Sequence, residues 1–464
     1  MPFGAGIAVL LLLLIGLLHL PYPLGGDQAL FMVFARAMDQ GATLYVDYWD
    51  LKQPGIFLFY WAAGKLMSFT EQGLHLFELL YLLAASCFIA ATAPLRRPWL
   101  VPLAAYGTYY CASGWAELTQ VEILVSLPVY FCLWVGTRRD ERAWVLGLAG
   151  VCIGAVACFK LVLAPLPALL VLAGVRRMRS WFVVAAASVA TVAPVLLWLA
   201  WRGALDDLLW TTFVFPRESV GKRGIKDLPM LLNSARWFFV HFAPWVIGAA
   251  AAIPWLLRAR NRFFVLAAAW AGIGLALITA QVLSWWPYHF ELIMLPVALL
   301  AVAAIEQLPG RWPVAAVAAG LLLYSPQMVR KLGPLRWQAG DEYRQTISPV
   351  YADAWRETRF LFEADATPGP VYVLGNPVYL WLSARPQVPH LDGWAAQYRS
   401  PAQWRSFAED LRRTQPRYVF IESAYAELIP KFSPETAQVL AEDYRVKSQS
   451  AAGTWLTRHF VTLY

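Results

Sequence analysis

Apolar residues along the chain gather in long stretches that carry few or no charged side chains. The first of them, residues 4–20, reads GAGIAVLLLLLIGLLHL. A helix needs about 20 mostly apolar residues to cross the hydrocarbon layer of a membrane. We therefore predict about eleven transmembrane helices, at residues 4–20, 74–93, 98–112, 121–136, 143–158, 161–175, 181–200, 237–257, 263–283, 290–305 and 312–327.

The first apolar stretch has a second interpretation, a secretory signal that is cleaved from the mature chain. Such signals begin with basic residues and end at a small-x-small cleavage site. Neither feature is found between Met1 and Pro21. We expect an uncleaved membrane anchor.

Arginine clusters between the apolar stretches predict the orientation of the chain. They fall in alternate loops, and basic loops of membrane proteins face the cytoplasm. An odd number of spans places every cluster on that face, so the N-terminus is predicted to be cytoplasmic and everything after residue 328 to be extracytoplasmic. The clusters are Arg96 and Arg97; Arg138, Arg139 and Arg142; Arg176, Arg177 and Arg179; Arg258, Arg260 and Arg262; and Arg311.

The C-terminal part of the chain, residues 331–464, has a different pattern. Short β-like runs alternate there with helix-like stretches, and turn signals such as Thr367-Pro368-Gly369 separate them. This alternation predicts a small soluble α/β domain. Its expected strands are 371–375, 417–423 and 454–457, and its expected helices are 351–365, 403–413 and 435–444.

Composition agrees with a membrane protein and excludes two other classes. The chain is 59% hydrophobic and 15% charged, against about 45–50% and 25% in soluble domains. The net charge of +8 is spread over short clusters between apolar stretches, which argues against a nucleic-acid partner. The five cysteines all lie in apolar runs without a CxxC pair, so we expect neither a disulfide framework nor a metal site from them.

Two predicted outer loops, 21–72 and 202–236, are much longer than the other connections. Loops of this length in a compact protein are usually functional or disordered. The first contains the amphipathic runs FMVFARAM and GIFLFYWAAGKLM, which suit a position along the membrane surface. The outer face is therefore where we expect chemistry.

Asp27 is the candidate catalytic acid or base, in Gly25-Gly26-Asp27-Gln28 directly after the first predicted span. A carboxylate at this boundary meets both a lipid-linked and a water-soluble substrate. The alternative role is the N-cap of a helix through Met38, and the two roles are compatible.

The same loop carries a dense polar and aromatic segment, Tyr45 to Gly55. Lys52 offers a cation for a phosphate, and Asp47 or Asp50 offers a carboxylate to orient it or to bind a metal. The alternative is a packed interfacial loop anchored by its aromatic residues.

Ionisable residues beside other spans complete the candidate set. Ionisable groups in or beside a span are functional candidates by default. The alternative for a lysine is that its side chain extends to the interface to be hydrated. The alternative for the basic residues of a loop is a solvated surface. Basic residues outside the membrane oppose the usual bias, which favours phosphate binding. The residues are Glu117, Glu122, Lys160 and His289, with Arg217, Lys222, Arg223 and Lys226 in the second long loop.

Walker A, HExxH, GxSxG and GxGxxG motifs are absent from the sequence. Instead, an ordered set of segments resembles the GT-C superfamily of membrane glycosyltransferases. The resemblance is closest to the bacterial branch related to protein O-mannosyltransferases and to the aminoarabinose transferase of lipid A. The segments are GGDQ, LYVDYWDLKQPGIF, AELTQVE, ACFKLVLAPLP, WWPYHFELIMLP, VYVLGNPVYLWLSARP and QPRYVFIES.

The resemblance implies inverting sugar transfer on the outer face of a bacterial cytoplasmic membrane, from a polyprenyl-phosphate donor to a glycan, lipid or protein acceptor. It implies that Asp27 is the general base, which accelerates such reactions by about 10²–10⁴. A cation must stabilise the departing phosphate. Its candidates, in falling order, are Lys52, Lys160, Arg217 and His289, and the expected substrate-binding site also includes Tyr45, Asp47 and Glu122.

One residue departs from the family pattern, in which a second acid often follows the first. Gln28 stands there, and a neutral amide is a weaker metal ligand, so a divalent metal cofactor is in doubt. Two other functions remain open: a transporter or flippase of lipid-linked sugars, and a non-catalytic assembly protein of the envelope. Transporters favour mid-membrane charges and repeated halves, whereas the charges here gather at the outer rim and no repeat is visible.

Overall fold

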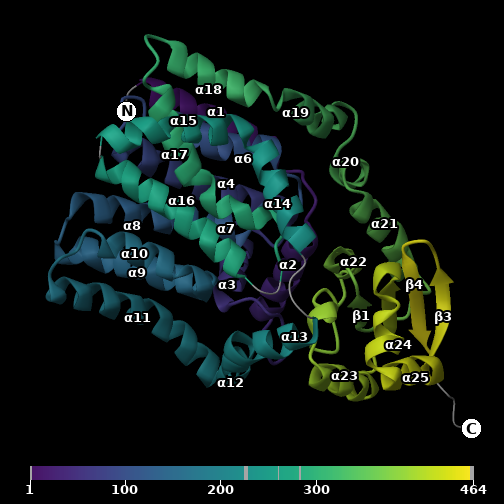
Figure 1. Ribbon diagram of the computed structural model, residues 1–464. Coiled ribbons are helices and arrows are strands. Elements are labelled where there is room, and N and C mark those ends of the chain that lie inside the picture. The colour runs from purple at the N-terminus through teal and green to yellow at the C-terminus, as the bar shows by residue number, and fades with distance from the viewer. Residues whose placement is uncertain (1–2, 224–227, 260, 282–283, 460–464) are drawn as a thin grey trace, which may run out of the picture.

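A computed structural model describes residues 3–223, 228–259, 261–281 and 284–459 (Figure 1). Helices fill the membrane part, and a small sheet with its own helices forms the C-terminal domain. The helices up to the second long loop are α1 (Phe3–Leu17), α2 (Gly26–Asp39), α3 (Pro54–Met67), α4 (Glu71–Thr92), α5 (Leu100–Pro102), α6 (Thr108–Ala112), α7 (Val121–Leu124), α8 (Ser126–Arg138), α9 (Ala143–Phe159), α10 (Pro165–Leu172) and α11 (Met178–Trp201). Those that follow are α12 (Leu205–Leu209), α13 (Phe215–Arg223), α14 (Leu228–His241), α15 (Ala243–Ala259), α16 (Arg262–Ala280), α17 (Met294–Ile305) and α18 (Trp312–Leu322).

Among the described residues, five helical segments are long and apolar enough to cross a membrane, or up to seven if two bent pairs each count as one span. Three further predicted spans coincide with the shorter apolar helices Gly4–Leu17, Ala143–Phe159 and Leu161–Leu172. The last, 98–112, falls on α5 and α6 with a π-helical turn between them. Each predicted stretch is thus mostly helical over its described residues, while the number that cross the membrane stays a prediction.

The predicted stretch 237–257 is not one straight helix. Helix α14 ends at His241, α15 begins at Ala243, and the two helices are bent by 85°. Pro244 lies in the first turn of α15, where a proline is favoured because its missing N–H is not needed.

The second long loop is largely helical. Helices α12 and α13 and the start of α14 occupy most of 202–236. Lys226 lies outside the described residues, as do the side chains of Lys222 and Arg223.

The arginine clusters gather through contacts between loops that are distant in the sequence. Arg97 donates to the carbonyl of Gly310 at 2.8 Å, and Arg262 donates to the carbonyl of Gly136 at 3.1 Å. Loops that contact one another lie at the same end of the helices, which agrees with their predicted placement on one face.

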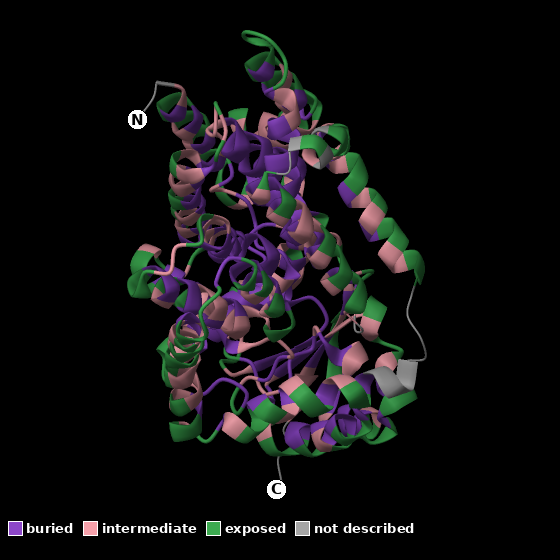
Figure 2. Ribbon diagram, turned by 60° about the vertical axis from the view of Figure 1, so that its left-hand side comes forward, coloured by how far each residue is buried: buried purple, intermediate pink, exposed green. Residues whose placement is uncertain are grey.

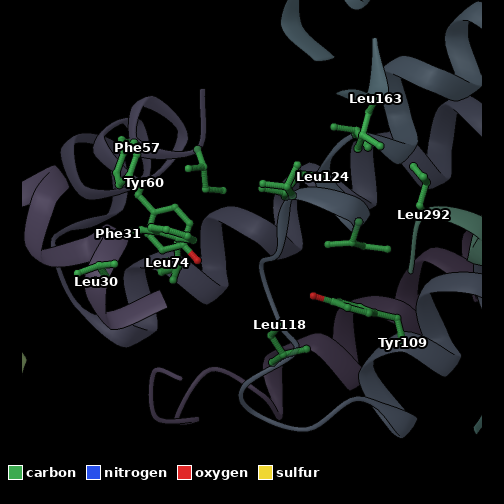
Figure 3. Close-up of a cluster of buried hydrophobic side chains, with 14 of the residues drawn as sticks. Leu30, Phe31, Phe57, Tyr60, Leu74, Tyr109, Leu118, Leu124, Leu163 and Leu292 are labelled. Atoms are coloured by element: carbon green, nitrogen blue, oxygen red, sulfur yellow. The ribbon is translucent and has the colours of Figure 1, made fainter. Parts of the chain in front are cut away.

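Helices α2 and α3 pack against each other through an aromatic core, while their predicted position along the membrane surface stays a prediction. The ring of Phe31 is 5.3 Å from that of Phe57 and 5.4 Å from that of Tyr60 (Figure 3). Both faces of α2 are buried from Gln28 to Met32. Figure 2 shows that buried residues run through the middle of the membrane part down to the C-terminal sheet.

The C-terminal domain contains a four-stranded sheet in the order β1-β2-β4-β3. Strand β1 is parallel to β2, and the other two pairs are antiparallel. Three strands were predicted and the fourth, β3, was not; the helix predicted at 435–444 ends at Asp443, and β3 begins at Tyr444. The strands are β1 (Val371–Leu374), β2 (Tyr418–Glu422), β3 (Tyr444–Gln449) and β4 (Gly453–Arg458). The helices leading into and within the domain are α19 (Ser325–Leu332), α20 (Gly340–Ile347), α21 (Pro349–Thr358), α22 (Pro377–Ser383), α23 (Pro401–Thr414), α24 (Leu428–Phe432) and α25 (Pro434–Asp443).

This domain docks on the first long loop. The amide of Trp49 donates to the carbonyl of His390 at 2.9 Å. The indole N–H of Trp381, on α22, donates to Glu71 at 2.8 Å. The first long loop is therefore held between the spans and the C-terminal domain, and α22 of that domain packs against α2.

Candidate active site at the start of helix α2

The start of α2 is capped by its own backbone and by Gln28. Gly25 is the N-cap, and its amide donates to the side-chain oxygen of Gln28 at 2.6 Å. The amide nitrogen of Gln28 donates to the carbonyl of Leu118. The expectation that Asp27 is the N-cap is therefore wrong, because Gln28 satisfies that end of the helix. Asp27 lies in the first turn, where the helix dipole favours a carboxylate and where its side chain is free to face outward.

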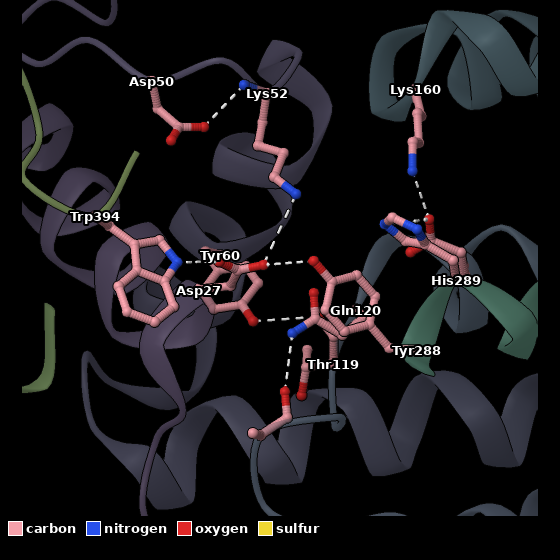
Figure 4. Close-up of polar contacts among 12 residues, drawn as sticks. Asp27, Asp50, Lys52, Tyr60, Thr119, Gln120, Lys160, Tyr288, His289 and Trp394 are labelled. Atoms are coloured by element: carbon pink, nitrogen blue, oxygen red, sulfur yellow. Dashed lines mark hydrogen bonds and ion pairs between the residues drawn. The ribbon is translucent and has the colours of Figure 1, made fainter. Parts of the chain in front are cut away.

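Three side chains surround the Asp27 carboxylate (Figure 4). The indole N–H of Trp394 donates to Oδ1 at 2.7 Å, and the hydroxyl of Tyr288 donates to Oδ2 at 3.0 Å. The ammonium of Lys52 lies 3.7 Å from Oδ2, and the side chain of Asp27 is 13% exposed. The carboxylate is thus oriented by two donors and remains accessible.

Glycine at two positions permits this close packing. A Cβ at Gly25 would lie 2.7 Å from the Cα of Ala116, and a Cβ at Gly26 would lie 2.7 Å from the ring of Trp394. Real Cβ atoms do not come so close to other atoms. The two glycines let the 113–120 loop and the indole approach the start of the helix.

Lys52 is fixed by the segment in which it lies. The hydroxyl of Tyr45 donates to the Lys52 carbonyl at 2.7 Å, and the Lys52 amide donates to Asp50 at 2.8 Å. Burial lowers the pKa of Lys52, but Asp27, Asp50 and Glu122 outweigh that effect and raise it above its ordinary value. The ammonium is therefore charged at neutral pH. Tyr45 acts on the site through the backbone that carries Lys52.

A second polar cluster lies beside the first and contains Glu122, Lys160 and His289. The ammonium of Lys160 is 2.6 Å from Glu122 Oε1, and Nε2 of His289 is 4.0 Å from the same oxygen. Lys160 ends α9, Glu122 lies on α7, and His289 lies on the 3₁₀ turn Pro287–Ile293. The side chains of Glu122 and His289 are almost fully buried.

Two cavities meet at Lys52. The larger, which we call the lateral cavity, has a volume of 370 Å³ and is lined by Lys52, Glu122, Lys160 and His289 together with apolar residues such as Leu161 and Phe213. The smaller, the interdomain cavity, has a volume of 90 Å³ and lies between the spans and the C-terminal domain, with Asp27 in its wall. Leu51, Lys52 and Ser284 line both cavities.

The structure thus brings together most of the residues predicted from the sequence. Asp27, Lys52, Glu122, Lys160 and His289 line one or both cavities.

Three predicted residues line neither cavity, and one of them is Tyr45, the buried residue that contacts the Lys52 carbonyl. Asp47 is exposed and accepts a hydrogen bond from the amide of Thr43 at 2.7 Å. Arg217 is exposed on α13 and is not among the residues that line either cavity.

Trp394 is a site residue that sequence reasoning missed. It lies 367 positions after Asp27, so no local pattern links the two. A single signal is present, an aromatic residue inside the polar turn His390-Leu391-Asp392-Gly393-Trp394.

The donor set does not fit a divalent metal ion. Both oxygens of Asp27 accept hydrogen bonds, and the side chain of Gln28 is turned toward Gly25 and Leu118. Across the described part of the chain, no group of three or more His, Cys, Asp or Glu side chains is arranged to hold a metal ion.

A polytopic helical body, an acid in its first long loop and an α/β domain docked over that acid together match the GT-C class of fold. The chain is similar to ArnT from Cupriavidus metallidurans bound to undecaprenyl phosphate, with a TM-score of 0.63 and 14% identity over 98% of each chain. It is similar to the apo state of that protein, with a TM-score of 0.64 and 15% identity over 97% of each chain. At this identity the likeness shows the fold, and the prediction of a GT-C-like membrane fold with a C-terminal α/β domain is confirmed.

The other comparisons add no argument. An oligosaccharyltransferase of Archaeoglobus fulgidus, in complex with Zn and sulfate, gives a TM-score of 0.48 and 11% identity over 97% of this chain and 72% of that one. No protein-family model and no curated protein matches the sequence.

Proposed function

We propose that the chain is an inverting glycosyltransferase that moves a sugar from a polyprenyl-phosphate donor to an acceptor on the outer face of the cytoplasmic membrane. One observation carries the proposal. A carboxylate, Asp27, and a charged amine, Lys52, lie 3.7 Å apart at the meeting point of two cavities. Such an arrangement serves a reaction that removes a proton from one substrate and stabilises a departing anion on the other.

The lateral cavity is our proposed site of the donor. Its polar wall offers Lys52, Lys160 and His289 to a phosphate, while Leu161 and Val162, each 41% exposed, suit an isoprenoid chain. A cavity that combines a cationic end with exposed apolar residues matches a lipid phosphate better than a free nucleotide. ArnT of the same fold binds undecaprenyl phosphate, which supports this assignment.

In the proposed reaction, Asp27 accepts the proton of an acceptor hydroxyl as its oxygen attacks the anomeric carbon. The bond from that carbon to the phosphate oxygen breaks, and its electron pair leaves with the phosphate. Lys52 stabilises the charge that develops there. Attack from the interdomain cavity, opposite a phosphate in the lateral cavity, inverts the configuration. Trp394 and Tyr288 hold the carboxylate in place by the hydrogen bonds described above.

The outer location is part of the proposal. The C-terminal domain, whose Trp394 contacts Asp27, lies on the opposite side of the view from the arginine-rich loops between α8 and α9 and between α10 and α11 (Figure 1). With those loops in the cytoplasm, the site faces the extracytoplasmic side.

The test is sugar transfer by purified protein in liposomes supplied with radiolabelled polyprenyl-phosphate sugars. Asp27→Asn should reduce release of polyprenyl phosphate by at least a hundredfold, since general-base help is worth about 10²–10⁴. Asp47→Asn is the matched control, because Asp47 is an exposed carboxylate of the same loop outside both cavities. Full activity in the Asp27 variant would remove the assigned base. Vesicle uptake of the donor without its cleavage would support a transporter instead.

A further inference from the structure

We propose that the acceptor is a neutral sugar ring that binds in the interdomain cavity, and that the C-terminal domain supplies half of this acceptor site. The inference rests on the proposed function and goes beyond it in naming the chemical class of the acceptor. Four properties of the cavity carry it: its aromatic lining, its polar partners, its charge and its size.

Aromatic side chains make up much of the cavity wall. Trp286 and Tyr288 come from the segment before α17, and Trp394, Tyr398 and Tyr425 come from the C-terminal domain. The rings of Trp394 and Tyr425 lie 6.5 Å apart with 30° between their planes. The face of an aromatic ring is electron-rich, so it attracts the polarised C–H bonds on the flat side of a pyranose.

These aromatic residues are only partly buried, in contrast to the aromatic core under them. Trp286 is 41% exposed, and Tyr288, Trp394 and Tyr425 keep intermediate exposure. Partly exposed rings around a polar cavity suit a ligand with both apolar and polar faces, and a sugar has both.

Polar groups in the same wall can pair with hydroxyls. Asp27 and Asp50 offer carboxyl oxygens, and Gln397 offers an amide that both donates and accepts. Burial and the neighbouring Asp392 raise the pKa of Asp50. Carboxyl and amide oxygens accept hydrogen bonds from hydroxyls, and the Gln397 amide nitrogen can donate to a hydroxyl oxygen.

The charge of the cavity argues against a phosphate acceptor. Of the described residues that line it, Lys52 is the one that carries a positive charge, and its ammonium already faces Asp27 at 3.7 Å. An anionic acceptor would place a second negative charge beside Asp27 without a cation of its own. Phosphate sites in proteins instead gather several positive or N–H donors.

The size of the cavity argues against an extended peptide. At 90 Å³ it is much smaller than the lateral cavity of 370 Å³. A space of this size admits the end of an acceptor, such as a terminal ring with its hydroxyl toward Asp27. A peptide acceptor would also seek backbone partners along a strand edge.

The experiment compares acceptors with the full-length protein in liposomes and a radiolabelled polyprenyl-phosphate sugar. The acceptors are an alkyl glycoside, phosphatidic acid and a Ser/Thr peptide. Release of polyprenyl phosphate measures the proposed function, and mass spectrometry identifies the glycosylated product. We expect the glycoside to stimulate release at least tenfold and to become the product. Donor cleavage with the sugar transferred to phosphatidic acid or to the peptide instead would overturn this inference alone. Absence of donor cleavage with every acceptor would overturn the proposed function as well.

A variant series tests the aromatic wall directly. Tyr425→Ala should raise KM for the glycoside more than tenfold and change kcat less than threefold, because it removes a ring that holds the acceptor. Tyr425→Phe keeps that ring and should restore KM to within threefold of the parent value. Trp337→Ala is the control, since Trp337 is 84% exposed and lies outside the cavity. An unchanged KM in Tyr425→Ala would contradict the proposed acceptor site.

Discussion

Substitutions in the ion pair between Lys160 and Glu122 should change the stability of the protein and its rate of sugar transfer in different ways. Its charged atoms lie 2.6 Å apart, and the side chains are 16% and 2% exposed. Removing one partner of a buried pair costs about 3–5 kcal/mol, because the other charge remains without compensation, whereas replacing both is often neutral. Since Lys160 keeps some contact with the lateral cavity, we expect about 3 kcal/mol for Glu122→Gln and for Lys160→Met.

The double variant Glu122→Gln/Lys160→Met should recover most of that loss. The free energies of unfolding are measured by SDS titration in mixed micelles, and the double-mutant cycle gives the coupling between the two residues. Sugar transfer is measured on the same samples. We expect the double variant to be nearly as stable as the parent and at least tenfold slower, because the donor phosphate has lost a cation. A double variant as unstable as the singles would refute the pairing argument, and full transfer without Lys160 would refute its role at the phosphate.

Three further predictions concern the residues around Asp27. Lys52→Met should slow sugar transfer by about a hundredfold, as for the loss of a charge-stabilising donor. The control Lys65→Met removes an exposed lysine of α3 and should leave the transfer rate unchanged in the same liposome assay. Trp394→Phe removes a hydrogen bond to the Asp27 carboxylate, and such a bond to a charged group is worth about 1.5–3 kcal/mol. The kcat should therefore fall by about ten- to a hundredfold with little change in KM for the donor. An unchanged kcat would show that the indole does not position the base. Burial raises the pKa of Asp392 and of its neighbour Asp50. The folded state therefore binds protons more tightly than the unfolded state. Its stability falls as the pH rises from the ordinary aspartate pKa of about 4 through the raised values. Thermal unfolding at pH 5 and pH 8.5 should show a smaller loss for Asp392→Asn than for the parent, and an equal loss would contradict this sign.

The helices of the membrane part were predictable because membrane helices need long apolar stretches, and those stretches are visible without any tertiary information. The break at Phe242 was not, since both halves of 237–257 are apolar and the bend depends on how α14 and α15 pack. Strand β3 was missed for a different reason. Its sequence YRVKSQ is exposed after Tyr444, and its alternation of apolar and polar residues is short and directly follows a helix-like stretch.

The site was predictable as a list of residues but not as a geometry. Asp27, Lys52 and Lys160 attract attention because charged residues at the edge of a membrane are costly unless they have a function. Asp47 attracts it equally, although the structure turns its carboxylate to the backbone of Thr43. Only the folded chain distinguishes a carboxylate that faces a cavity from one that closes a turn. The same limit applies to Trp394, which reaches Asp27 because the C-terminal domain docks over the first loop.

The four residues Gly25 to Gln28 illustrate how local and distant requirements act on one short segment. Gln28 is a neutral amide because it must accept from the Gly25 amide and donate to the carbonyl of Leu118, and a carboxylate can only accept. Gly26 is a glycine because the ring of Trp394 occupies the space of a Cβ. Gln28 caps the helix, and the two glycines let neighbouring atoms come close. Asp27 is therefore the residue of this segment that lines the interdomain cavity. The departure from a second acid is therefore a consequence of packing. It turns Gln28 into the residue that fixes the helix and leaves Asp27 as the one group of the segment able to accept a proton from a substrate.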